Sequence, residues 1–162
     1  CSVVLIVNKW DLMRAKKGFN QTQAADFIRR TMRFLGYAPI MFISAKKGTG
    51  FEDIGELLND ILEQKKHKVS THEFTEWVRR QSEIHNPKNA KFYMAHQAGR
   101  YPPTFICHVS DPQKIHFSLK RHLINAIRDK WGYMGSPVRL LFMKAKNVDR
   151  KISREMKHSS TR

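Results

Sequence analysis

The segment Asn8-Lys9-Trp10-Asp11 carries side chains that could recognise a nucleobase, and it directly follows an apolar run, Val3–Val7. A short, β-branched run that ends at polar residues is typical of a strand buried on both faces of a parallel sheet. Ligands of open α/β sheets bind at the carboxyl ends of strands. There the Asp11 carboxylate could accept hydrogen bonds from the ring N–H and the exocyclic amine of guanine, two donors that adenine does not present together. An ordinary polar loop is the alternative interpretation of four such residues.

A second polar segment, Ser44-Ala45-Lys46, ends another apolar run, Pro39–Ile43. Between the two runs, apolar residues at helical spacing predict a helix over about 21–35, opened by a capping box of Asn20 and Gln23. A strand–helix–strand unit places its strands in parallel, with a right-handed crossover. Both polar segments should therefore emerge side by side at one edge of the sheet, although a piece of only two strands would leave apolar faces without cover.

Together the two segments supply contacts for one guanine base. The Lys9 stem could cover the flat base, and the Asn8 amide could tie its own loop to the neighbouring one. On the second loop, the Ala45 backbone N–H could meet the guanine keto oxygen, and Lys46 could lie against base or ribose. We therefore predict guanine-binding residues in both segments: Asn8, Lys9, Asp11, Ser44, Ala45 and Lys46. This pair of motifs at this spacing resembles the fourth and fifth guanine-recognition motifs of Ras-like GTPases.

Residues 1–66 are predicted to form the carboxyl-terminal portion of a Ras-like GTPase domain, with a parallel βαβα order. Its last helix should start at a capping box of Thr49 and Glu52 and run to about Lys65. The charged segment 64–68 has no Gly or Pro, so we expect a stiff, partly helical joint there. The domain boundary is placed at this joint.

Residues 67–143 are predicted to form a second domain, of the α+β class. Ser70 and Glu73 make a capping-box pattern that opens a helix, and Asn86-Pro87 ends it. The later elements follow from alternating or helically spaced apolar residues: strands over 91–97 and 104–109 with a turn over 99–103 between them, a helix over 117–131 and a strand over 138–143. The resulting α-β-β-α-β order is similar to a KH-type RNA-binding domain. The GXXG loop of KH domains is absent, and residues 111–116 stand in its place.

The charge of the chain is uneven. The formal net charge is +16, and residues 66–162 contribute +13 of it, with 20 Lys and Arg against 7 Asp and Glu. This asymmetry indicates a polyanionic partner for the second half, and RNA is favoured over a membrane surface because no basic helix has a spare apolar face. Residues 144–162 have many charges and few apolar side chains, which predicts a disordered basic tail. Four polar residues should face outward on the helix over 117–131 and are the RNA-binding candidates, with a merely solvated face as the alternative: Arg121, His122, Asn125 and Arg128.

Aromatic, cysteine and histidine residues elsewhere in the chain are predicted to have structural roles rather than catalytic or binding ones. Trp77, Phe105 and Trp131 stand at core spacing, which predicts packing rather than base stacking. Cys107 and His108 are adjacent on a strand, so their side chains point to opposite faces, and the histidines show no metal-binding spacing. Two cysteines, and no apolar stretch long enough to cross a bilayer, predict a cytoplasmic protein without disulfides or membrane contact.

Short motifs in both halves resemble the Der (EngA) family, bacterial GTPases with two tandem GTPase domains followed by a KH-like domain. Trp10 matches the usual third residue of the family's second Asn-Lys-x-Asp motif. In the second half the matching motifs occur in the family's order: Ser70-Thr71, Pro102-Pro103-Thr104-Phe105, Ser110-Asp111-Pro112, His116-Phe117-Ser118 and Gly135-Ser136-Pro137-Val138-Arg139-Leu140. The resemblance covers residues 1 to about 143.

The resemblance implies a GTP hydrolase that acts in ribosome assembly. Its partners would be the large ribosomal subunit and ribosomal RNA, and its cofactors would be GTP or GDP with Mg²⁺. The sequence has no phosphate-binding Gly-Lys-Ser/Thr loop and no switch motifs ahead of the guanine segments. We therefore expect a carboxyl-terminal fragment that neither hydrolyses GTP nor binds it tightly by itself. A stand-alone RNA-binding module with a non-functional GTPase-like scaffold is the alternative.

Overall fold

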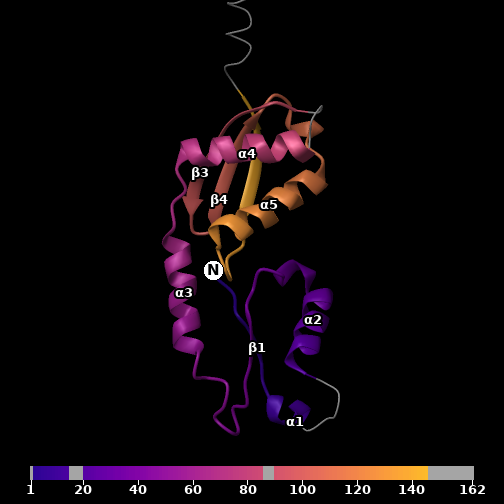
Figure 1. Ribbon diagram of the computed structural model, residues 1–162, viewed down its shortest axis with the longest axis vertical. Coiled ribbons are helices and arrows are strands. Elements are labelled where there is room, and N and C mark those ends of the chain that lie inside the picture. Colours follow the sequence, from indigo (N-terminus) through magenta and orange to yellow (C-terminus); the bar gives the residue numbers. More distant parts are fainter. Residues whose placement is uncertain (1, 15–19, 86–89, 146–162) are drawn as a thin grey trace, which may run out of the picture.

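Two separate sheets organise the chain in the computed structural model, which describes residues 2–14, 20–85 and 90–145 (Figure 1). The first half contains two short strands and their helices: β1 (Leu5–Val7), α1 (Trp10–Arg14), α2 (Gln21–Thr31), the 3₁₀ helix η1 (Arg33–Leu35), β2 (Ile40–Phe42) and α3 (Ile54–Lys66). The second half contains a three-stranded sheet and two long helices: α4 (Thr71–His85), β3 (Phe92–Arg100), β4 (Pro103–Val109), the 3₁₀ helix η2 (Pro112–Lys114), α5 (Phe117–Trp131) and β5 (Arg139–Lys144). No helix within these described ranges has the length and apolarity needed to cross a bilayer.

The first sheet consists of β1 and β2 in parallel, with Leu5 opposite Ile40 and Val7 opposite Phe42. The predicted parallel pairing is therefore confirmed. The prediction that β1 is buried on both faces is wrong, because Ile6 is 52% exposed while Leu5 and Val7 are partly buried. Side chains alternate across a strand, so the face that carries Ile6 is open. This agrees with the expectation that two strands alone leave apolar surface without cover.

Helix α2 begins where the sequence predicts it and ends early. The capping box is confirmed, since the Gln23 N–H donates to Asn20 Oδ1 (2.9 Å) and the Asn20 N–H donates to Gln23 Oε1 (3.2 Å). The helix ends at Thr31, short of its predicted end, and Met32 leaves the helical region with φ −105° and ψ 56° before η1 begins. The Thr31 hydroxyl donates to the Phe27 carbonyl (2.9 Å), and such side-chain bonding to a helix carbonyl bends and weakens a helix.

The predicted capping box of α3 is wrong. Thr49 instead closes a turn, because its backbone N–H donates to the Ser44 carbonyl (3.2 Å) and its carbonyl accepts from the Ser44 N–H (2.9 Å). The helix begins later, at Ile54. It continues to Lys66, so the joint over 64–68 is helical in its first three residues and the predicted partly helical joint is confirmed, and residues 67–70 separate α3 from α4.

The second sheet has the order β3-β4-β5, with β3 antiparallel and β5 parallel to the central β4. Figure 1 shows α4 and α5 on one side of it. The α-β-β-α-β order is confirmed, and α5 spans the predicted residues 117–131. Strand β3 continues to Arg100, so the turn predicted over 99–103 is confined to Tyr101 and Pro102.

The start of α4 matches its prediction in part. The Ser70 hydroxyl accepts from the Glu73 N–H (3.2 Å), which caps the helix. The Glu73 carboxylate forms an ion pair with Lys130 (3.0 Å), so it links α4 to α5. The predicted helix end at Asn86-Pro87, and residues 146–162 of the predicted tail, lie outside the described ranges. The start of the tail is wrong, because Lys144 is the last residue of β5 and is paired with Val109.

An aromatic cluster fills the space between the second sheet and its helices. The Phe74 ring lies at its centre, with its centroid 4.6 Å from that of Phe105 and 5.8 Å from that of Trp77. Trp131 closes the cluster, 4.8 Å from Trp77. Phe74 and Phe105 have no accessible surface and Trp77 is nearly buried. These rings therefore form the core, as predicted, and are not base-stacking platforms.

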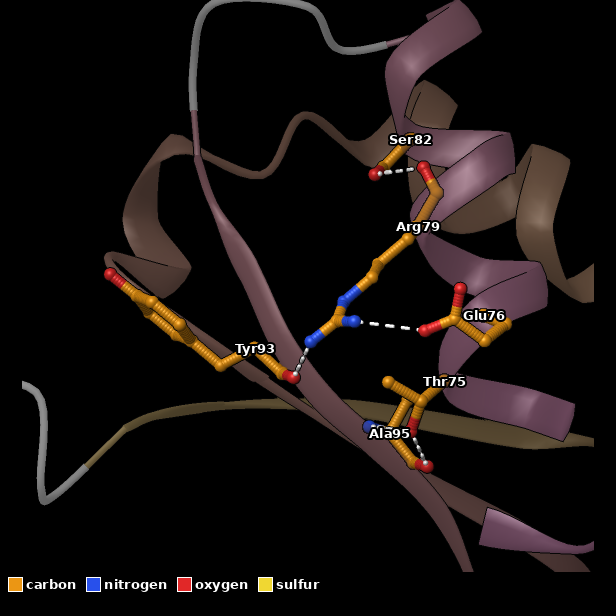
Figure 2. Close-up of polar contacts among 6 residues, drawn as sticks. All are labelled: Thr75, Glu76, Arg79, Ser82, Tyr93 and Ala95. Atoms are coloured by element: carbon orange, nitrogen blue, oxygen red, sulfur yellow. Dashed lines mark hydrogen bonds and ion pairs between the residues drawn. The ribbon is translucent and has the colours of Figure 1, made fainter. Parts of the chain in front are cut away.

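Side chains of α4 close the outer edge of β3 (Figure 2). The Thr75 hydroxyl donates to the Ala95 carbonyl (2.8 Å) and also accepts from the Ala95 N–H (3.0 Å). Arg79 extends the contact, because its guanidinium donates to the Tyr93 carbonyl (2.7 Å) and to the Glu76 carboxylate (2.9 Å). An edge strand with free backbone groups is a template for pairing with another chain, and these bonds occupy that edge.

We predict that Thr75→Val lowers the free energy of unfolding by about 1–3 kcal/mol, because the new side chain leaves both polar groups of Ala95 without their partner. Urea unfolding would measure the change. Thr31→Val is the matched control, since Thr31 is exposed and its hydroxyl bonds only within α2. Equal loss in the two variants would contradict the role of the edge contact.

Candidate guanine site and basic groove

The two predicted guanine-binding loops meet at the carboxyl ends of β1 and β2. Asn8 joins them, because its Oδ1 accepts from the Lys9 N–H (2.7 Å) in its own loop and from the Ala45 N–H (3.1 Å) in the other. Lys9 adopts a left-handed backbone conformation, φ 62°. The predicted tie between neighbouring loops through the Asn8 amide is thus present.

A second bond joins the loops through Asp11. The buried Ser44 hydroxyl donates to Asp11 Oδ1 (2.7 Å) and accepts from the Lys47 N–H (3.3 Å). The hydrogen bond from Ser44 lowers the pKa of the Asp11 carboxyl below its ordinary value, and the charges of Lys47 and Lys46 lower this pKa further. The carboxylate therefore stays ionised at neutral pH, as an acceptor of base N–H groups must be.

Helix α1 positions Asp11, which the sequence placed in a loop. The helix begins at Trp10, whose ring lies 4.5 Å from that of Phe42 and whose N–H donates to the Ile43 carbonyl (2.9 Å). Arg14 is the last residue of this helix, and residues 15–19 lie outside the described ranges.

One predicted contact differs from its expected form. The Ala45 N–H, assigned to the guanine keto oxygen, donates to Asn8, so it would have to exchange that bond to meet a base. Lys9 and Lys46 are exposed at the same edge, where they could still lie against a ligand.

Sequence reasoning missed the importance of Gly50. It has φ 84°, and a Cβ there would collide with the Phe42 carbonyl. Its place in a Gly-rich turn was the available signal.

The four predicted RNA-binding residues of α5 fall into two pairs. Arg121 and Asn125 are exposed, as predicted. The prediction that His122 faces outward is wrong, because it is partly buried and its Nε2 lies 2.9 Å from Gln81 Oε1. Arg128 was predicted to face outward, which is wrong: it is partly buried, with its guanidinium 5.1 Å from the centre of the Tyr37 ring. Burial lowers the pKa of Arg128 from its ordinary value.

Three of these residues, all but His122, line a groove of about 820 Å³ between α5 and the segment after α2. The first half contributes Arg33, Phe34 and Tyr37 to its wall. Sequence reasoning missed these residues because it divided the chain at residue 66, and no local pattern shows which surfaces of two units face each other.

Hydrogen bonds between the halves hold the groove walls in place. Gly135 accepts from the Val3 N–H (2.7 Å) and donates to the Tyr37 carbonyl (2.9 Å). Gln64 of α3 accepts from the Met134 N–H (2.8 Å). Gly135 has φ 69°, and a Cβ there would lie 3.0 Å from the Val3 carbonyl oxygen, so this contact favours glycine. Within the described residues, no cluster of His, Cys, Asp or Glu could hold a metal ion.

The mixed α/β fold, with its parallel strand pair, ends in a KH-like domain: residues 68–143 match a family described as the KH-domain-like, C-terminal domain of EngA bacterial GTPase enzymes. GTPase Der of Lactobacillus johnsonii is 34% identical over 149 residues, 89% of this chain and 34% of that protein. GTPase Der of Halothermothrix orenii is 35% identical over 146 residues, 87% of this chain and 33% of that protein. Residues 68–143 therefore form the KH-like domain found at the C-terminus of EngA GTPases, and the chain as a whole is similar to part of GTPase Der, as a carboxyl-terminal fragment of such a protein would be. It spans about a third of the length of the curated relatives it matches.

We predict that Ser44→Ala raises the pKa of Asp11 toward its ordinary value of 3.8, because the largest cause of its depression is removed. The stabilisation from this bond is present above the unfolded-state pKa and disappears as pH falls through the folded-state pKa. Carboxyl ¹³C NMR across an acid titration would measure it. Ser2→Ala is the control, since Ser2 bonds to Ser136. An Asp11 pKa equally low in both variants would contradict the assignment.

Proposed function

We propose that this chain is the guanine-reading and RNA-contacting part of a cytoplasmic GTP hydrolase that acts in assembly of the large ribosomal subunit. The tie between the two loops, Asn8 to Ala45 and Ser44 to Asp11, is the observation that carries the guanine half of the proposal. Similarity over most of the chain to proteins named GTPase Der supports the hydrolase half.

In this proposal the first half is the carboxyl-terminal portion of a Ras-like domain. The ionised Asp11 accepts from the ring N–H and exocyclic amine of guanine, and Lys9 and Lys46 flank the base. Most of a GTPase's grip on its nucleotide comes from a phosphate-binding loop, its lysine and Mg²⁺. The sequence contains no such loop ahead of Asn8, so residues 1–162 address the base alone and bind GTP weakly. Mg²⁺ and the phosphates are held elsewhere in the whole protein.

The second half is proposed to contact ribosomal RNA. Its net charge of +13 favours a polyanion, and Arg121 and Asn125 present exposed cationic and amide groups on α5. Arg128 adds a charge beside them, although its packing against Tyr37 gives it a structural role as well.

For the guanine half, we predict that Asp11→Asn changes base preference from guanosine toward xanthosine. The amide would offer a donor where the guanine amine also donates, whereas xanthine presents an acceptor there. One such mismatch costs about 1–3 kcal/mol, or roughly 5- to 150-fold in affinity. NMR titration of the chain with each nucleoside would measure this. Asp53→Asn, outside the loops, is the control, and an unchanged preference for guanosine would remove Asp11 from the role.

For the RNA half, we predict that affinity for ribosomal RNA falls steeply with salt, because binding releases counterions. Arg121→Glu should weaken binding and reduce the slope of log affinity against log salt by about 0.7 or more, the contribution of one phosphate contact. Fluorescence anisotropy at several salt concentrations would measure both. Arg100→Glu is the matched control, because it makes the same change of charge at an exposed site outside the groove. Binding that ignores salt would refute the proposal, and RNA binding without any nucleoside binding would favour a non-functional GTPase-like scaffold.

A further inference from the structure

The groove between α5 and the segment after α2 is lined from both halves of the chain. Arg33, Phe34 and Tyr37 stand on one side, and Phe117 and Arg121 on the other. Figure 1 shows α5 on the side of the second half that faces the first half. Because backbone hydrogen bonds join the two halves at Gly135, the walls do not depend on a flexible linker.

Positive charge is concentrated in this groove and is not neutralised there. Arg33, Lys120, Arg121 and Arg128 line it, against the single acid Asp129. Among the ion pairs formed by described residues, none involves any of these four cations. A ligand that supplies several negative charges would meet this demand.

Two phenylalanines give the groove a second property. Phe34 is 75% exposed and Phe117 is 72% exposed, the two highest values among the large apolar side chains described as exposed. They come from opposite walls, one on η1 and one at the start of α5. An exposed aromatic ring beside cations suits a ligand that alternates flat apolar groups with negative charges.

We infer that this groove binds a single-stranded RNA segment, with bases stacked on Phe34 and Phe117 and with phosphates held by the surrounding arginines and lysine. The inference rests on the proposed RNA contact and adds its site and its strand preference. Base-paired nucleotides keep their faces inside the duplex, so only unpaired bases reach the rings. The exposed Asn125 amide, in the same groove, can hydrogen-bond a base edge. An acidic peptide would satisfy the cations but would leave both rings without partners.

A labelled oligouridylate of about eight nucleotides, within the span of known single-strand sites, is the probe, and a duplex of the same length is its comparison. We expect the single strand to bind more tightly. Phe34→Ala and Phe117→Ala should each weaken its binding by about 5- to 150-fold, the loss that follows removal of one base–aromatic stack. Phe27→Ala is the matched control, because Phe27 is 67% exposed and lies outside the groove.

A gain-of-signal variant avoids reliance on lost binding. In Phe34→Trp the indole keeps a stacking face, and its fluorescence should be quenched by the oligonucleotide, whereas Phe27→Trp should show no added quenching. RNA binding that the two alanine variants reduce no more than the control would overturn the groove site and leave the proposed function standing. Equal affinity of the chain for the single strand and for the duplex would also overturn the groove site. So would displacement of the oligonucleotide by polyglutamate, if the two alanine variants also kept their affinity for the oligonucleotide. Failure of the chain to bind any RNA would refute the proposed function itself.

Discussion

Burial of the inward side of β4 is the constraint on which the rest of the second half depends. Phe105, Cys107 and Val109 have no accessible surface, so apolar cover is needed along the whole strand. Helices α4 and α5 supply it from two distant parts of the sequence, and Phe74 joins them to the strand. The same burial raises the pKa of the Cys107 thiol to about 12. That side chain therefore stays protonated and acts as a small apolar group rather than as a nucleophile.

Once α5 is held on the sheet, the loop that follows it can reach the first half. Gly132 leaves the helix with φ 81°, and the next residues bond to Gln64, Tyr37 and Val3. Three separate segments of the first half are thus joined by hydrogen bonds to one loop of the second. The basic groove follows from this arrangement, because the position of Tyr37 beside Arg128 sets the distance between its walls.

Local patterns predicted the elements whose burial is decided by near neighbours. The α5 boundaries and its inward residues Leu119, Leu123 and Ile127 follow from helical spacing alone. The predictions failed where a distant partner decides. Ile6 is exposed because no other described element covers the strand face that carries it, whereas the prediction from the apolar run assumed that both faces are covered. Thr49 matches a capping box, yet its backbone bonds to Ser44 across a turn.

In the candidate site, too, some features follow from local sequence patterns and others depend on distant partners. The guanine loops were predictable because a βαβ unit places its two strand ends together. The partner of the Ala45 N–H was not predictable, since the donor bonds to the Asn8 side chain of the other loop rather than staying free for a base. The parallel pairing of β5 with β4 has a further consequence, for synthesis of the chain: β5 is the last of the described strands, and α5 is the crossover connection that brings it back beside β4. Until residues 139–144 arrive, one edge of β4 has no strand beside it. Assembly of this sheet is therefore governed by contacts of long sequence separation, and the incomplete intermediate has the open edge that favours association between nascent chains.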